Sequence, residues 1–450
     1  MTVDRRRFLS LAAAGALGLA LDREARAMGR TPLGGRLSLH VPWPTGSIDP
    51  HDLRDPLAAL FASAAFDPLC GLDAAGAPYP ALAAALPTRE AGQTVVRLRE
   101  GLRTARLTGL DARDVVFSIE RARARGASAI LADLPRPVPH KGDPLAVVFA
   151  NADPLRLARA LASPLAAIVP RRFTPASPDG TGAFRADVSS AGLILSRNLA
   201  AARGPSFLDA IDVLPAEDLK RSLRAFEAER DDLGWLGLGL YDARKGAVRF
   251  DLGRAAWVVL VTGPDAGALP GQAQRLVNAI PPERLAHLGL GPLPGASGDP
   301  AWSGPPAELL VDESSPHLVE VARAVAPVLS AAGHEVTLTP VPRDAVRRRL
   351  KGKPALAIDL VRPLGPSSLH ALIALGTAED PARGRDLARS PPRVVPGASA
   401  RSLTDLLRVG VLGDVRVAGG QMPDLALMRS PHGDGWDLGA SFKRPPKKPL

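Results

Sequence analysis

The feature that most limits the possible folds of this chain is a regular alternation of apolar segments between residues 308 and 361. Ser315 and Pro316 begin a segment whose apolar residues repeat at helical spacing, and Gly333 follows it as a C-terminal cap. A second helical segment covers residues 344–350. Short apolar runs, typical of buried strands, lie at residues 308–312, 336–341 and 355–361. Strands separated by helices of this length predict that this region is α/β with a largely parallel sheet.

The first 27 residues have the pattern of an export signal. Arg5-Arg6-Arg7-Phe8-Leu9 is typical of substrates of the bacterial twin-arginine translocation (Tat) machinery. The uncharged stretch from Phe8 to Leu21 is too short for a stable membrane anchor, and Ala25-Arg26-Ala27 provides a cleavage site near Ala27. We therefore expect a mature chain that begins at Met28 and is released into the periplasm or outside the cell. An uncleaved helix or a short membrane anchor is the alternative interpretation.

Length and charge narrow the class of protein further. A mature chain of about 420 residues is too long for one core and predicts two or three domains. The single cysteine, Cys70, has no partner for an intramolecular disulfide. The net charge is +10, but the basic residues are scattered and aromatic residues are few. We therefore expect a solvated basic surface and no binding of nucleic acid.

No motif for catalysis or metal binding is found in the sequence. None of the eight histidines pairs with another at metal-ligand spacing. The chain has neither a Gly-x-Ser-x-Gly elbow nor a phosphate-binding loop. Cys70 follows an apolar helical segment, as a small core residue does more often than a nucleophile. We expect no enzyme, no metal and no cofactor; an exported enzyme on an unrecognised fold is the alternative.

Several motifs follow one another in a fixed order along the mature chain. The most specific is the pair Leu98-Arg99-Glu100-Gly101 and Ala112-Arg113-Asp114-Val115-Val116-Phe117-Ser118. The other segments are Ile48-Asp49-Pro50, residues 65–83 with Asp67-Pro68-Leu69, Gly180-Thr181-Gly182-Ala183-Phe184, and the unit at residues 308–361. In this order they resemble family 5 of the extracytoplasmic solute-binding proteins, the oligopeptide-, dipeptide- and nickel-type receptors of ABC importers.

The resemblance implies a periplasmic binding protein-like fold of type II. Two lobes are joined by hinge strands, and the N-terminal lobe carries an extra subdomain. The lobes would close around a solute and present it to a membrane permease, without chemistry on the solute. Receptors of this kind are usually monomers. The implied boundaries are 1–27 for the signal peptide, 36–60, 165–253 and 425–440 for lobe I, 61–164 for its subdomain, 254–424 for lobe II, and 441–450 for a basic disordered tail.

The chain departs from the family where peptide-binding members hold the amino terminus of their ligand. Those members usually carry a tryptophan and an acidic residue after a strand of the second lobe. Here the stretch reads Asp359-Leu360-Val361-Arg362-Pro363, and Arg362 stands near the place of the acid. A ligand ammonium group would lack its counter-charge. We therefore expect a ligand other than an ordinary peptide, with Arg362 as the candidate anchor for a carboxylate or phosphate. A surface or structural arginine is the alternative.

Aromatic residues line peptide-binding grooves, so the remaining tryptophans are candidates for the cleft wall. These are Trp43, Trp235 and Trp257, of which Trp257 lies on the predicted hinge strand. Each could equally be a core residue.

The sequence thus predicts a solute-binding receptor of an ABC importer that captures a peptide-like or other small solute. The competing hypothesis is a degenerate binding protein that acts as a partner-binding or regulatory protein of the periplasm.

Overall fold

A computed structural model describes residues 33–444, except residues 74, 236–243, 293–301, 332 and 432. The predicted signal peptide and residues 445–450 of the predicted tail lie outside the described residues. No helix within the described ranges is long and apolar enough to cross a membrane.

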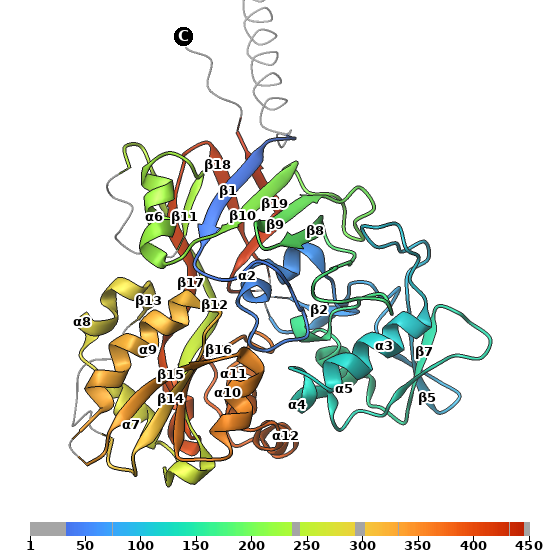
Figure 1. Ribbon diagram of the computed structural model, residues 1–450. Helices are drawn as coiled ribbons and strands as arrows, with labels where there is room; N and C mark the ends of the chain where they lie inside the picture. Colours follow the sequence, from blue (N-terminus) through green and yellow to red (C-terminus); the bar gives the residue numbers. More distant parts are fainter. Residues whose placement is uncertain are drawn as a thin grey trace, which may run out of the picture.

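Lobe I is built on a four-stranded sheet with the order β1-β10-β9-β8. β1 is parallel to β10, and the other neighbouring pairs are antiparallel. Alternation along β1 explains its two faces: Leu37 and Leu39 are fully buried, whereas the side chains of Ser38 and His40 contact the carboxylates of Asp232 and Asp231. The strands are β1 (Arg36–Val41), β8 (Phe184–Ser189), β9 (Gly192–Arg197) and β10 (Ala210–Pro215), at the top of Figure 1.

Helix α2 (Pro56–Ala65) packs against this sheet and leads to the subdomain. Asp55 caps it by accepting the N–H of Ala58, and Pro56 occupies the first turn, where it costs no hydrogen bond. The subdomain, at the lower right of Figure 1, has a sheet with the order β4-β5-β7-β6. Its elements are β2 (Cys70–Leu72), β3 (Pro78–Pro80), β4 (Thr88–Glu90), β5 (Gln93–Arg97), α3 (Ala112–Arg123), α4 (Ser128–Leu131), β6 (Pro137–Pro139), β7 (Ala146–Ala150) and α5 (Pro154–Ala160).

Lobe II contains the predicted strand–helix–strand unit. β14 is parallel to both β15 and β16, as the sequence predicts. β14 is buried on both faces: Leu309 and Val311 belong to the cluster that includes α9, and Leu310 to the cluster that includes α10. The elements of this unit are β14 (Ala307–Asp312), α9 (Pro316–Leu329), β15 (Val336–Val341), α10 (Arg343–Leu350) and β16 (Ala355–Val361).

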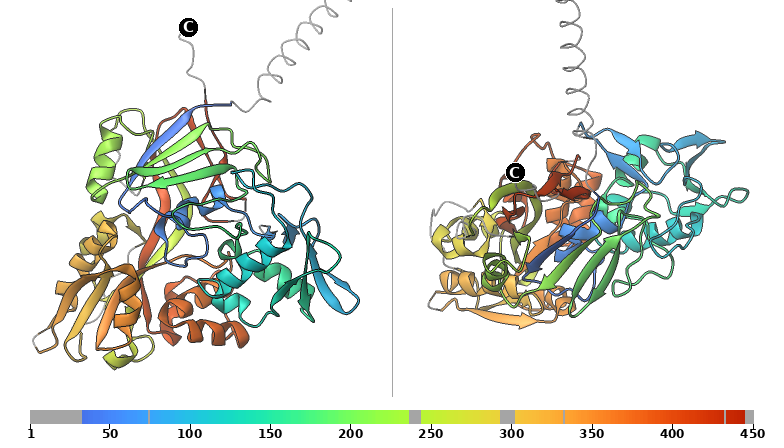
Figure 2. Two further views of the ribbon diagram at one scale, coloured as in Figure 1. Left: turned by 45° about the vertical axis from the view of Figure 1, so that its right-hand side comes forward. Right: turned by 90° about the horizontal axis from the view of Figure 1, so that it is seen from above.

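Two long antiparallel strands connect the lobes. β12 (Val248–Thr262) and β17 (Val409–Gln421) pair along most of their length, and β12 also pairs with β16 in lobe II. In Figure 1 and in the left view of Figure 2, both strands rise from lobe II to the sheet of lobe I.

Further elements are α6 (Leu219–Glu227), β11 (Leu233–Trp235), α7 (Gln272–Asn278), α8 (Pro282–Leu285), β13 (Leu290–Gly291), α11 (Ser368–Glu379), α12 (Pro381–Arg389), β18 (Leu425–Arg429) and β19 (Trp436–Lys443).

The last strand corrects one boundary. Residues 441–443 were predicted to begin a disordered tail, but they complete β19, and Lys443 pairs with Leu425 of β18. The reason is that these residues have partners: Ser441 is fully buried, and the Lys443 ammonium lies 2.6 Å from the carboxylate of Asp232.

Candidate functional site

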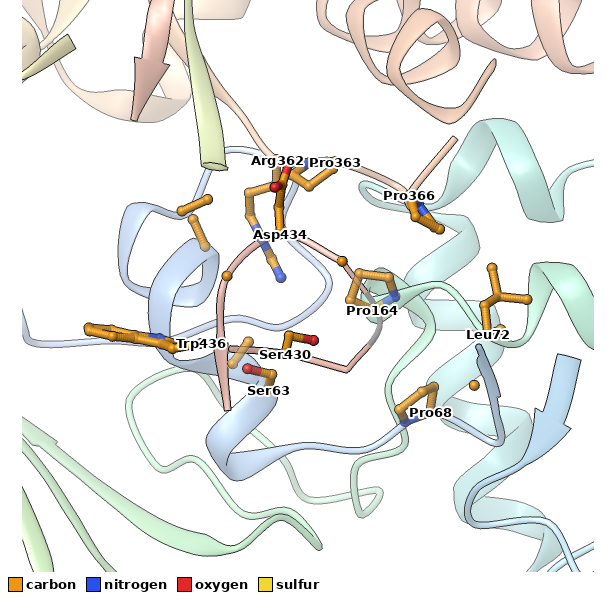
Figure 3. Close-up of a pocket in the computed structure, with 18 of the residues that line it drawn as sticks. Ser63, Pro68, Leu72, Pro164, Arg362, Pro363, Pro366, Ser430, Asp434 and Trp436 are labelled. Atoms are coloured by element: carbon orange, nitrogen blue, oxygen red, sulfur yellow. The ribbon is translucent and has the colours of Figure 1, made fainter. Parts of the chain in front are cut away.

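A cavity with a volume of about 470 Å³ lies between the lobes. Its wall combines α2, the β2–β3 region, the segment that follows β16, and the turn between β18 and β19. In Figure 3, Arg362, Pro363 and Pro366 lie on one side of the cavity, and Ser63 and Pro68 lie opposite. The apolar part of the wall includes Ala59, Phe66, Leu72, Ala162 and Val417. Its volume is in the usual range of small-molecule sites.

Three arginines and two aspartates line this cavity. In the first group, Nε of Arg203 donates a hydrogen bond of 2.8 Å to Oδ1 of Asp67. Thr181 donates through its hydroxyl to Oδ2 of the same carboxylate, also at 2.8 Å. The charge of Asp67 raises the pKa of Arg203. The Gly-Thr-Gly turn is thereby connected directly to a charged residue of the cavity wall.

The second group surrounds Arg254 on hinge strand β12. Its guanidinium lies 4.5 Å from the ring centre of Trp257, a cation–π distance. One Nη is 3.2 Å from Asp434 of the β18–β19 turn, and the other is 3.7 Å from Asp414. Burial raises the pKa of Asp414. The positive charge of Arg254 is therefore balanced by two carboxylates, and its guanidinium packs on an aromatic ring.

Cys70, the one candidate nucleophile among the cysteines, does not line the cavity. Burial raises the pKa of Cys70 to about 12, which keeps the thiol protonated near neutral pH. No group of three or more potential metal ligands occurs within the described part of the chain. What the cavity wall offers is guanidinium donors, carboxylates and apolar surface, the chemistry of a site that holds an organic molecule.

No protein-family model and no curated protein matches the sequence. The fold, by contrast, matches solved structures over most of the chain. The pheromone receptor PrgZ aligns with a TM-score of 0.65 and 15% identity, over 91% of this chain and 99% of that structure. The binding protein AgaA of A. tumefaciens R10, in complex with agropinic acid, aligns with a TM-score of 0.66 and 14% identity, over 91% and 99%. NikA from Staphylococcus aureus, in complex with Ni(L-His)2, aligns with a TM-score of 0.63 and 14% identity, over 91% and 100%.

The chain has the fold of these solute-binding proteins. The predicted type II architecture, with two lobes, is confirmed, and so is the resemblance to family 5 at the level of the fold. Within this fold the cavity occupies the space between the lobes, where the sequence predicts a ligand.

Arg362, the predicted anchor, lines the cavity, but its guanidinium is also hydrogen-bonded to backbone carbonyls of the protein. It is only 3% exposed. Its Nη1 donates to the carbonyl oxygens of Pro50 and Asp52 at 3.1 and 2.8 Å, and its backbone N–H donates to the carbonyl of Leu53 at 2.8 Å. Burial lowers its pKa, and the charge of nearby Asp55 opposes this. Arg362 therefore joins lobe II to the loop before α2; contact with a ligand stays a prediction.

Neighbouring contacts strengthen the same junction. Arg343 of α10 lies 3.1 Å from the Asp52 carboxylate, and Arg54 forms an ion pair with Asp359 of β16. In the loop itself, Nε2 of His51 donates to the carbonyl of Ala167 at 2.7 Å, and burial lowers the pKa of His51 to about 4. The loop before α2 is thus bound to lobe II by several arginine contacts.

Two of the three tryptophans predicted for the cleft wall, Trp43 and Trp257, are buried and do not line the cavity. Trp257 is 1% exposed beneath Arg254 and is not among the residues that line the cavity. Trp43 is equally buried and packs edge-on against His317, with 5.8 Å between ring centres. Trp235 ends β11, and its side chain lies outside the described part of the structure. For Trp43 and Trp257 the reason is burial, because each is enclosed in the core.

A tryptophan that lines the cavity was missed. Trp436, the first residue of β19, donates from Nε1 to the carbonyl of Leu60 at 2.6 Å and packs on Phe61. Asp434, Arg203 and Arg254 were also missed. The one sequence signal here is a pair of glycines: Asp434 lies between Gly433 and Gly435, and Trp436 follows them at the start of a strand. Both glycines have positive φ, as residues of a tight turn often do. The fold was needed to place that turn at the cavity.

Proposed function

We propose that this protein is a solute-binding receptor of an ABC importer. The observation that supports this most is the cavity of about 470 Å³, with walls contributed by both lobes and by hinge strands β12 and β17. Rotation of the lobes about such strands would open and close the cavity around a solute. We infer no reaction on the solute, because the wall offers binding groups and the similar structures are binding proteins.

The remaining parts of the proposal concern location and partners. The N-terminal pattern supports export by the Tat route, cleavage near Ala27 and a periplasmic location. The partner is an ABC permease in the membrane, to which a monomeric receptor would deliver its solute. Peptides, nickel complexes and opines, bound by the similar structures, are the first solutes to test.

The receptor proposal predicts stabilisation by a solute that enters the cavity. Thermal unfolding of the mature protein, with each solute in turn, should identify a ligand that adds about 2.7 kcal/mol of stability at a concentration of 100 times Kd. Ala59→Trp would fill part of the cavity and should remove this effect, whereas Ala85→Trp, at an exposed position, should retain it. If no solute binds, the degenerate partner-binding protein becomes the better description.

Export is tested through the twin arginine. Exchange of both Arg5 and Arg6 for Lys keeps the charge but removes the residues that the Tat machinery reads. We expect the uncleaved precursor to accumulate in the cytoplasm, as measured by cell fractionation and the size of the protein. Arg7→Lys is the matched control and should be exported normally. Unchanged export of the double variant would exclude the Tat route.

A further inference from the structure

Arg203 lines the cavity with a guanidinium group that is hydrogen-bonded through Nε and partly exposed elsewhere. Its Nε is bound to Asp67, as described above. The Arg203 side chain is nevertheless 47% exposed, whereas that of Asp67 is 1% exposed. Within the described ranges, the two Nη groups of Arg203 have no hydrogen-bond partner. The guanidinium therefore presents its outer N–H donors to the cavity that it lines.

The position of Arg203 is fixed through both its side chain and its backbone. Asp67 is held by the buried hydroxyl of Thr181. Ala202, which precedes Arg203, donates its N–H to the carbonyl of Thr181 at 2.9 Å. Asn198 donates through its side chain to the carbonyl of Gly182 at 2.8 Å. A guanidinium held in this way loses little conformational entropy when it binds a ligand.

The other two arginines of the wall are less exposed than Arg203: the side chain of Arg254 is 27% exposed, and Arg362 is 3% exposed. Both Nη groups of Arg254 face carboxylates, and Nη1 of Arg362 donates to backbone carbonyls in a buried junction. Asp437 and Tyr79 lie near Arg203, but Asp67 has the largest influence on it. Arg203 is therefore the cation best placed to accept a new anionic partner.

We propose that Arg203 binds the carboxylate of a small organic acid through its Nη groups, with Asp67 and Thr181 as positioning residues. This rests on the proposed receptor function and names its class of ligand. A guanidinium matches the two oxygens of a carboxylate with two parallel hydrogen bonds. The apolar wall beside it, including Phe66 and Leu72, covers the carbon skeleton of the acid. One open guanidinium edge suits a single negative charge.

The test compares acids with their neutral derivatives. N-acetyl amino acids, sugar acids and small keto acids, each paired with its methyl ester or amide, are titrated calorimetrically into the mature protein. The wild type should bind an acid about 10- to 100-fold more tightly than its neutral derivative, the range for a hydrogen bond to a charged group. The double variant Asp67→Asn with Arg203→Met removes both charges together, so that no buried carboxylate is left unpaired. It should bind acid and neutral derivative equally.

Two further variants separate positioning from charge. Asp67→Asn alone keeps the cation and weakens its attachment, so it should reduce the preference for acids by a smaller factor. Arg203→Lys keeps the charge but loses the paired donors, so it should retain only part of the wild-type preference for acids.

The outcomes distinguish the anchor from the receptor. Equal binding of acids and neutral derivatives by the wild type, or an unchanged preference in the double variant, would overturn the role of Arg203 and leave the receptor function intact. If neither these compounds nor the peptides, nickel complexes and opines bind, the receptor function fails and the anchor fails with it.

Discussion

Replacement of Arg362 by Met should destabilise the folded protein by about 3–5 kcal/mol, the cost typical of breaking a buried charged network. Methionine preserves much of the length of the side chain but donates no hydrogen bond. The buried carbonyl of Pro50 and the partly buried carbonyl of Asp52 would then lose the donor that now lies 3.1 and 2.8 Å away. The carboxylates of Asp52 and Asp55 would also lose a nearby positive charge. Because Arg362 connects lobe II to the loop before α2, the junction between the lobes should loosen first.

The free energy of unfolding, from urea titration of the mature protein, measures this effect. Arg113→Met, at an exposed position of α3, is the matched control and should change stability by less than about 0.5 kcal/mol. An Arg362→Met protein with normal stability but no affinity for its solute would contradict the structural role. It would favour the sequence-based hypothesis that Arg362 is the ligand anchor.

The elements that could be predicted from the sequence are those with local signals. The predicted strand at residues 355–361 is β16 with the same bounds, and the helix predicted to begin at Ser315 and Pro316 is α9. Asp111, at the start of α3, forms a capping box with Asp114, three residues further along the chain. Apolar periodicity and caps depend on neighbours within a few residues, so the chain itself carries the information.

The cavity wall depends on contacts between distant parts of the chain. Asp67 and Arg203 are 136 residues apart in sequence, and no spacing rule connects them. The motif comparison drew attention to Arg362, but it could not show that the guanidinium would be occupied by carbonyls more than 300 residues away. Nor could it distinguish Trp257, buried under Arg254, from Trp436, which lines the cavity, because both follow ordinary strand patterns.

Replacement of Gly182 by Ala should cost about 2–3 kcal/mol of stability through overpacking. A Cβ atom at this position would lie 2.5 Å from the carbonyl oxygen of Ala64 and 2.6 Å from the carbonyl carbon of Ala65. These are backbone atoms at the end of α2, so no side chain can rotate aside to make room. The N–H of Gly182 also donates to the carbonyl of Ala65 at 3.0 Å, which ties the turn to the helix. The methyl group must therefore push the turn and the helix apart.

The same displacement should reach the cavity, because the neighbouring Thr181 holds Asp67 and thereby Arg203. We expect Gly182→Ala to lower both the urea midpoint and the preference for acids over neutral derivatives. Gly46→Ala is the matched control, since a Cβ there meets no atom within 4 Å, and it should leave both quantities unchanged. If Gly182→Ala lowers stability but leaves the preference unchanged, the turn and the guanidinium are not mechanically coupled. Arg203 would then be held by Asp67 alone, and Thr181 would have no positioning role.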